Sequence, residues 1–220
     1  RHRAGMNVAG SSDRPWLPQW LFWPVLLAFA LAHAGWSWGD AKKHSPTFDE
    51  PMHAVGAFLH LHRGDFRINP EDPPLWQYWA ALAWGADRFS VDPFNPQWIE
   101  SASRVDLQWR ITIDELIDRP ERDPVGFVMA MKQRMVVLGA AVVFSVGFLG
   151  RLVLTRFSRH ANALALLAAF LCAIEPNFLA HSSMLKNDVG LTLTWLWMAA
   201  GLWWVGQRIT IPRIALLGIA

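Results

Sequence analysis

The chain has 220 residues, of which 53% are hydrophobic and 14 are Trp, and its formal net charge is +2. This composition is more apolar and richer in Trp than that of a typical soluble domain of the same size. A single cysteine, Cys172, excludes a disulfide framework within the chain.

Apolar residues are gathered in blocks separated by charged loops, a pattern that predicts an all-α, polytopic membrane protein with four to five spans. The third block is fully apolar only as far as Ile174, which is short for a bilayer of about 30 Å. The last block is cut off, so we expect the N-terminal part of a longer protein. The expected spans are 20–38, 135–154, 161–179, 189–205 and a fifth that begins after residue 213.

Short segments rich in Arg predict the orientation, because short basic loops mark the cytoplasmic side of a membrane. Residues 1–19 are then a cytoplasmic tail, and 20–220 are the transmembrane domain, with a long extracytoplasmic loop over 39–128. A second outer loop covers 175–188. The basic residues that support this orientation are Arg1, Arg3, Arg14, Arg151, Arg156, Arg159, Arg208 and Arg213.

Within the long loop we expect short helices and no folded soluble domain. Residues 51–63 predict a helix that Gly64 ends, with Thr47 and Glu50 as a capping box. Residues 74–85 are aromatic and too short to span, which is typical of a helix in the membrane interface. The polar segment 93–124 contains the pattern of an amphipathic helix at 98–117.

Asp49 and Glu50 are adjacent carboxylates just beyond the first span, and His53 follows one helical turn later. A helix N-terminus favours ionised carboxylates, and an ionised carboxylate can accept a proton from an attacking hydroxyl. These residues therefore form a candidate catalytic group. The alternative is that Glu50 only caps a helix and His53 only lies at the interface.

Other polar residues near the span ends are candidates for substrate or metal binding. Glu71 lies on a stiff, Pro-rich turn, and Asp188 lies at the mouth of the fourth span, where it caps that helix or faces a site. A divalent cation (Mg, Mn or Zn) shared by Asp49 and Asp188 suits carboxylate ligands. Basic residues that could contact a phosphate are Arg63, Arg67, Arg134 and Lys186.

The motifs together resemble the GT-C membrane glycosyltransferases, in particular the dolichyl-phosphate-mannose protein mannosyltransferase group and its bacterial relatives. The resemblance rests on Asp-Glu-Pro-x-His at 49–53, Asn-Pro-Glu-x-Pro-Pro-Leu at 69–75, the Arg within 133–139 and the acidic loop at 176–188. It covers roughly residues 20–205. The chain departs from the family pattern at Asp72 and Gln77.

The resemblance implies an enzyme that moves a sugar, with inversion, from a polyprenyl-phosphate donor to a protein, lipid or glycan hydroxyl. It implies that Asp49 is the catalytic acid of the first outer loop and that Glu50 is its paired neighbour. It places the protein in a bacterial inner membrane or an ER-type membrane, with its site on the outer face and no nucleic-acid partner. The substrate-binding residues would include His53, Glu71, Arg134, Lys186 and Asp188.

The main alternative is a multispan transporter or assembly protein whose outer loop binds a ligand without catalysis. Ionisable residues inside spans mark transport pathways. His33 is the one ionisable residue well inside the first span. This pattern favours chemistry at the outer face over transport.

Overall fold

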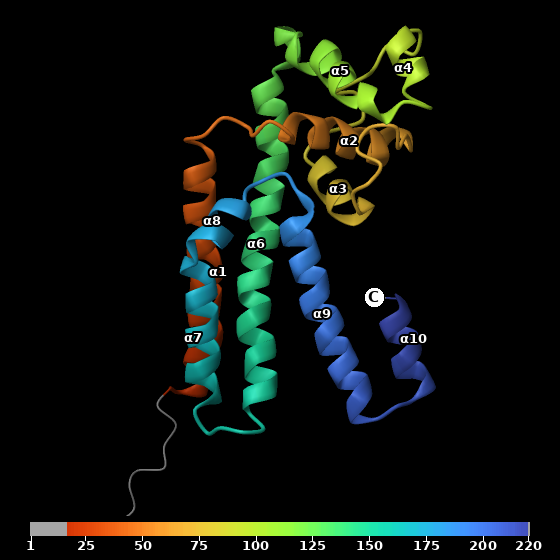
Figure 1. The fold of residues 1–220 in the computed structure, drawn as a ribbon. Helices are drawn as coiled ribbons and strands as arrows, with labels where there is room; N and C mark the ends of the chain where they lie inside the picture. Colours follow the sequence, from red (N-terminus) through yellow and green to blue (C-terminus); the bar gives the residue numbers. More distant parts are fainter. Residues whose placement is uncertain (1–16, 220) are drawn as a thin grey trace, which may run out of the picture.

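The computed structural model describes residues 17–219, and all of the regular structure in this range is helical (Figure 1). The prediction of an all-α protein is confirmed. Residues 1–16 of the predicted tail, with Arg1, Arg3 and Arg14, lie outside the described range. The ten α-helices are α1 (Gln19–Ala41), α2 (Glu50–Arg63), α3 (Pro74–Ala81), α4 (Pro96–Glu100), α5 (Gln108–Thr112), α6 (Pro124–Leu154), α7 (Ala161–Ile174), α8 (Pro176–His181), α9 (Asn187–Gln207) and α10 (Ile211–Ile219).

Three helices are long and apolar enough to cross a membrane: α1, α6 and α9. The prediction of a membrane protein is thereby supported, with three helices of sufficient length and hydropathy within residues 17–219, and the expected total of four to five spans stays a prediction. The expected third span, 161–179, is wrong as a single helix. It is divided into α7, with 14 residues and a length of about 21 Å, and the short α8, because Pro176 begins a new helix.

Helix α6 is the central element of the bundle and begins 11 residues before the predicted start of the second span. Its start has a local cause: Pro124 takes the first helical position, and the Asp123 side chain accepts a hydrogen bond of 3.1 Å from the N–H of Gly126. The extra turns raise α6 beyond α1 and α7, so one helix joins the membrane bundle to the outer loop (Figure 1).

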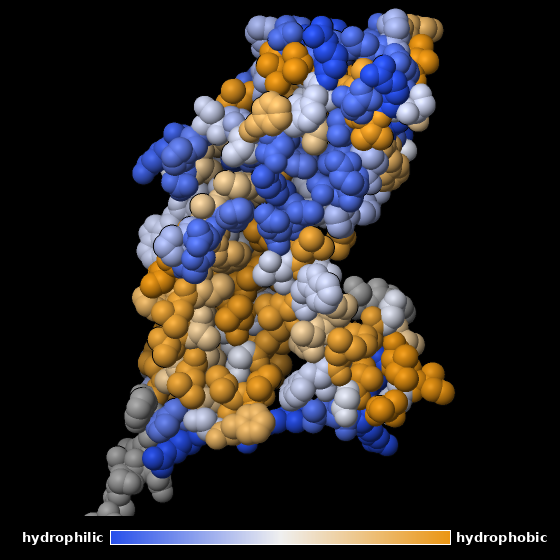
Figure 2. Space-filling view, viewed as in Figure 1, coloured by the Kyte–Doolittle hydropathy of each residue, from blue (hydrophilic) through white to orange (hydrophobic). Residues whose placement is uncertain are grey.

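The connections α6–α7 and α9–α10 lie at the same end of the bundle, and the segment 42–123 lies at the other end (Figure 1). This arrangement agrees with the predicted grouping of the basic loops. Hydrophobic surface covers the bundle between the two ends, and hydrophilic surface covers the outer-loop end and the tip of the α6–α7 connection (Figure 2). The surface therefore has the banded pattern of a membrane-spanning protein.

The short helices of the long loop pack with the outer part of α6 around one buried core, a packing that the sequence pattern did not predict. Phe58 on α2, Trp76 on α3 and Ile111 on α5 are buried in one cluster with Phe127 and Met131 of α6. Because α6 contributes to this cluster and also to the transmembrane bundle, the outer layer is fixed to the membrane layer.

The predicted helices 51–63 and 74–85 are confirmed, the second in shortened form. Helix α2 ends at Gly64, which has a φ of 62°, a left-handed conformation that glycine adopts easily. Helix α3 begins at Pro74 as predicted and ends at Ala81.

The predicted amphipathic helix at 98–117 is wrong as a continuous element. The chain forms α4, a 3₁₀ turn, α5 and a π-helical turn over this range. The break has a chemical cause: the hydroxyls of Ser101 and Ser103 donate hydrogen bonds to the backbone carbonyls of Trp98 and Glu100. Such side-chain bonds compete with helix continuation.

Two glycines on α6 provide a matched test of this packing. A Cβ at Gly139 would lie 2.7 Å from the Cβ of Ser182, whereas a Cβ at Gly150 would meet Ala165 at an ordinary 3.7 Å. We expect Gly139→Ala to reduce the free energy of unfolding by about 1–3 kcal/mol. Gly150→Ala should leave it unchanged or raise it by up to about 1 kcal/mol. Apparent melting temperatures in detergent measure both, and equal shifts would contradict the packing described here.

Candidate functional site

The N-terminus of α2 presents Asp49 at the outer end of the bundle. The Thr47 hydroxyl donates a hydrogen bond of 2.9 Å to Asp49 Oδ1, and the Thr47 N–H donates one of 2.6 Å to Glu50 Oε2. The second bond is one half of the predicted capping box. It directs Glu50 inward and leaves Asp49, one position earlier, about one-third exposed.

Asp49 forms an ion pair with Lys186, which comes from the second outer loop. Lys186 Nζ lies 2.8 Å from Asp49 Oδ2, and His53 Nε2 lies 3.7 Å from the same oxygen. Partial burial opposes ionisation of Asp49, but hydrogen bonds from Lys186 and Thr47 outweigh this effect and hold the pKa of Asp49 below its ordinary value. The bond to Asp49 raises the pKa of Lys186. Asp49 is therefore an ionised carboxylate in contact with a cation.

Glu50, in contrast, is fully buried. Its Oε1 accepts hydrogen bonds of 2.8 Å from Lys132 Nζ on α6 and 2.8 Å from the N–H of Leu185 in the second outer loop. Lys132 Nζ also donates to Oε2, at 2.9 Å. These contacts occupy both carboxylate oxygens. Glu50 therefore connects α2, α6 and the second outer loop. The sequence analysis expected Glu50 to be the catalytic neighbour of Asp49, whereas the structure buries Glu50 in an ion pair.

His53 lies between Asp49 and a second carboxylate, Asp72. His53 Nδ1 is 3.3 Å from Asp72 Oδ2, and the side-chain amides of Asn69 and Asn187 donate hydrogen bonds of 2.9 and 3.1 Å to Asp72. The turn at 69–75 is thereby joined to the first residue of α9. The structure brings together Asp49, His53 and Lys186, three residues that the sequence offered as separate candidates.

The other predicted substrate-binding residues form no hydrogen bond or ion pair with Asp49, His53 or Lys186 in the described range. Asp188 is exposed and pairs with His181 at 3.2 Å. Glu71 is exposed and makes no hydrogen bond or ion pair with residues 17–219. Arg134 donates to the Leu82 carbonyl at 3.2 Å and lies over the Trp79 ring, so it is held against α3.

The predicted metal site receives no additional ligands. Within residues 17–219, no three His, Cys, Asp or Glu side chains are grouped as a metal site would require. Asp49 and Asp188, the two predicted ligands, are each paired with a different basic residue. The residues present therefore do not fit a shared divalent cation.

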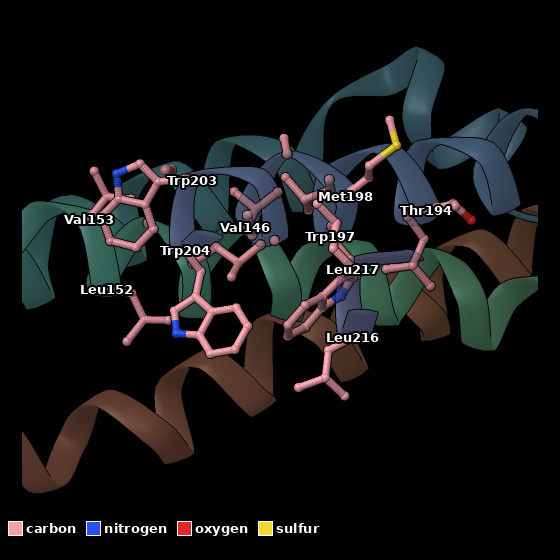
Figure 3. A pocket seen from close by; sticks show the side chains of 18 of the residues that line it. Val146, Leu152, Val153, Thr194, Trp197, Met198, Trp203, Trp204, Leu216 and Leu217 are labelled. Atoms are coloured by element: carbon pink, nitrogen blue, oxygen red, sulfur yellow. The ribbon is translucent and has the colours of Figure 1, made fainter. Parts of the chain in front are cut away.

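An apolar groove lies between α6, α9 and α10 and has a volume of about 1040 Å³. Its wall includes Val146 and Val153 from α6 and Trp197, Trp203 and Trp204 from α9 (Figure 3). Figure 3 shows that hydrocarbon and indole groups supply most of this wall.

Helix α3 contributes both to the groove wall and to the surroundings of the polar site. Leu75 lines the groove, and its neighbour Trp76 packs close to Gly190 in the first turn of α9. The rings of Trp76 and His53 lie in edge-to-face contact, with centroids 6.0 Å apart. Leu75 and Trp76 therefore connect the groove wall to the surroundings of His53.

The sequence-based analysis missed Lys132, although the sequence carries a signal for it. Lys132 lies on α6 among the buried residues Val128, Met131, Met135 and Val136, so it is a cation on an otherwise apolar face. A buried cation requires an ionic partner. The predicted outer loop ends at 128 and the predicted span begins at Met135, so Lys132 lies in neither element.

A comparison with known protein families, characterised proteins and solved structures finds no match for this chain.

The buried and exposed ion pairs predict different costs for the same substitution. Lys132→Met leaves the Glu50 charge buried without its partner, and we expect a loss of about 3–5 kcal/mol in the free energy of unfolding. Lys186→Met breaks the pair with Asp49, which is about one-third exposed and worth at most about 1 kcal/mol. Thermal unfolding in detergent compares the two variants. Similar losses would show that the Glu50–Lys132 contact does not hold the outer layer.

Proposed function

We propose that this protein is a membrane glycosyltransferase that moves a sugar from a polyprenyl-phosphate donor to a hydroxyl group. The acceptor belongs to a protein, a lipid or a glycan on the extracytoplasmic face of a bacterial inner membrane or an ER-type membrane. The motif resemblance to the GT-C enzymes suggests this class. One structural observation supports it: the ionised Asp49 pairs with Lys186, the N-cap residue of α9, and an apolar groove runs along the same helix from Leu193 onward.

The groove suits the donor because a polyprenyl chain is a long hydrocarbon. The groove lies along α9, and only a small fraction of the apolar part of α9 is buried, so the surrounding lipid has access to this helix. A chain that enters from the membrane buries hydrocarbon against Trp197 and Trp203, and such burial is favourable. The anionic head group would then lie toward the N-terminus of α9, where helix N–H groups and Lys186 favour a negative charge.

Asp49 suits the role of general base. In a single displacement, Asp49 accepts the proton of the acceptor hydroxyl while the hydroxyl oxygen bonds to the anomeric carbon of the sugar. The bond from that carbon to the phosphate oxygen breaks with its electron pair, and polyprenyl phosphate leaves as an anion. A cation near the leaving oxygen stabilises the charge that develops there. Lys186 is the cation that contacts Asp49.

In this proposal Glu50 positions the site and does not touch the substrate. Its bond to the Leu185 N–H fixes the residue directly before Lys186, and its bond to Lys132 fixes α2 on α6. Glu50 therefore sets the distance between Asp49 and the second outer loop.

The transporter alternative gains no support from His33. His33 is fully buried, with Nδ1 2.9 Å from the Ala173 carbonyl oxygen and Nε2 2.8 Å from Ser182 Oγ. These bonds join α1 to α7 and to the end of α8. Both ring nitrogens thus have structural partners, and the residue joins helices instead of lining a path.

The proposed base predicts a specific loss of activity. In proteoliposomes with a radiolabelled polyprenyl-phosphate sugar, we expect Asp49→Asn to reduce transfer at least about 100-fold, because the amide cannot accept the hydroxyl proton. Asp40→Asn removes an exposed carboxylate at the same end of the bundle and should retain activity. Equal activity of the parent and Asp49→Asn would show that Asp49 is not the catalytic base. No transfer from any donor would favour ligand binding or transport.

The groove predicts a second, separable effect. Ala200 lines the groove, whereas Leu191 lies nine residues earlier and therefore on the opposite side of α9, against a smaller cavity. Ala200→Trp should fill the groove and weaken binding of a polyprenyl-phosphate sugar, with Leu191→Trp as the control. A titration in nanodiscs measures both dissociation constants. Unchanged binding in Ala200→Trp would show that the donor chain lies elsewhere.

A further inference from the structure

The contact between Asp49 and Lys186 creates a difficulty for the proposed base. Asp49 Oδ1 accepts a hydrogen bond from Thr47, and Oδ2 accepts one from Lys186 at 2.8 Å. Both oxygens therefore have donors, and the neighbouring cation lowers the affinity of Asp49 for a further proton. The arrangement suits a resting site better than a reacting one.

We propose that Lys186 exchanges partners during the reaction cycle. Without donor, its ammonium group holds Asp49. When a polyprenyl phosphate enters the groove, its phosphate takes Lys186 away from Asp49, and the donor itself releases the base. This inference rests on the proposed function, since it assigns to Lys186 the phosphate of that donor.

Lys186 suits such an exchange because the backbone before it is fixed and its side chain is partly exposed. The preceding residue, Leu185, is fully buried, and its N–H is bound to Glu50. The Lys186 side chain is about one-third exposed, and in the described chain its ammonium group is paired with Asp49 alone. A lysine side chain is long and flexible, so the ammonium group can change partner while the loop stays in place.

The position of Lys186 also suits a phosphate. Lys186 is the N-cap residue of α9, and no side chain caps the N–H groups of the first turn. These groups and the helix dipole favour an anion at this end, where the exposed Asp188 carboxylate of the first turn is the competing charge. The groove begins on the same helix at Leu193, six residues after Asn187, which is about 9 Å along the axis. A lipid phosphate can therefore meet Lys186 while its chain occupies the groove.

A fixed bridge is the competing arrangement. An ammonium group has three protons, so Lys186 could contact Asp49 and a phosphate at the same time. The two arrangements predict opposite effects of Asp49 on phosphate binding. In the exchange, Asp49 competes with the phosphate for Lys186. In the bridge, Asp49 holds Lys186 in place for it.

A double-mutant cycle on ligand binding separates these arrangements. The probe is a polyprenyl monophosphate without sugar, titrated into the protein in nanodiscs, and the matching polyprenol controls for the chain. We expect Asp49→Asn to tighten phosphate binding about two- to fivefold, the worth of a partly exposed ion pair. Lys186→Met should weaken it about tenfold, and adding Asp49→Asn to Lys186→Met should give no gain. Lys43→Met, an exposed lysine, controls for net charge.

Three results would overturn the exchange. Weaker binding in Asp49→Asn would indicate the bridge. The same gain in the parent and in the Lys186→Met background would mean that Asp49 only repels the phosphate. No effect of Lys186→Met would show that Lys186 does not bind it. Melting temperatures check that each variant is folded.

The cycle also separates this inference from the proposed function, because it measures binding without sugar transfer. If the binding changes follow the prediction but the protein transfers no sugar, the exchange is supported and the glycosyltransferase proposal is refuted. Sugar transfer by the parent without the predicted cycle would refute the exchange alone.

Discussion

The architecture depends on one buried ion pair, between Glu50 and Lys132. Glu50 comes from the start of α2 and Lys132 from the outer part of α6, and the N–H of Leu185 completes the contact. Three segments far apart in the chain therefore meet at one carboxylate. A charge buried in this way is costly without its partners, so the pair fixes these three segments in a single arrangement.

This fixed contact explains why the candidate site has a fixed backbone and partly exposed side chains. Residues next to the buried pair carry the reactive groups: Asp49 precedes Glu50, and Lys186 follows Leu185. Their backbones are held by the pair, while their side chains reach solvent. The same α9 that begins at this site forms a wall of the apolar groove below it. In the proposed function, adjacent parts of this one helix recognise the head group and the hydrocarbon of the donor.

Much of the local structure could be predicted from the sequence, because its causes are local. Gly64 ended α2 as expected, and the spacing of Asp49 and His53 placed them on one helix face. Two breaks were not predicted by the hydrophobic pattern. Pro176 divides the third apolar block, and the Ser101 hydroxyl competes for a backbone carbonyl within 98–117.

The candidate site was predictable only in part, because its contacts join distant segments. The motif identified Asp49 and His53, and Lys186 was a basic candidate near a span end, but no spacing rule pairs Glu50 with Lys132, 82 residues away. Arg134, chosen as a basic residue near a span, is instead held against α3 by the Leu82 carbonyl. Pattern identifies residue types that suit a chemistry, and tertiary packing decides which of them meet.

The anomeric configuration of the product tests the central claim most directly. A single displacement assisted by Asp49 inverts the sugar, because the hydroxyl attacks opposite the departing phosphate. NMR of the glycosylated acceptor, made by the protein from a donor of known configuration, reports this outcome. The account predicts inversion. Retention would require a second displacement and would contradict Asp49 as the base of a direct transfer.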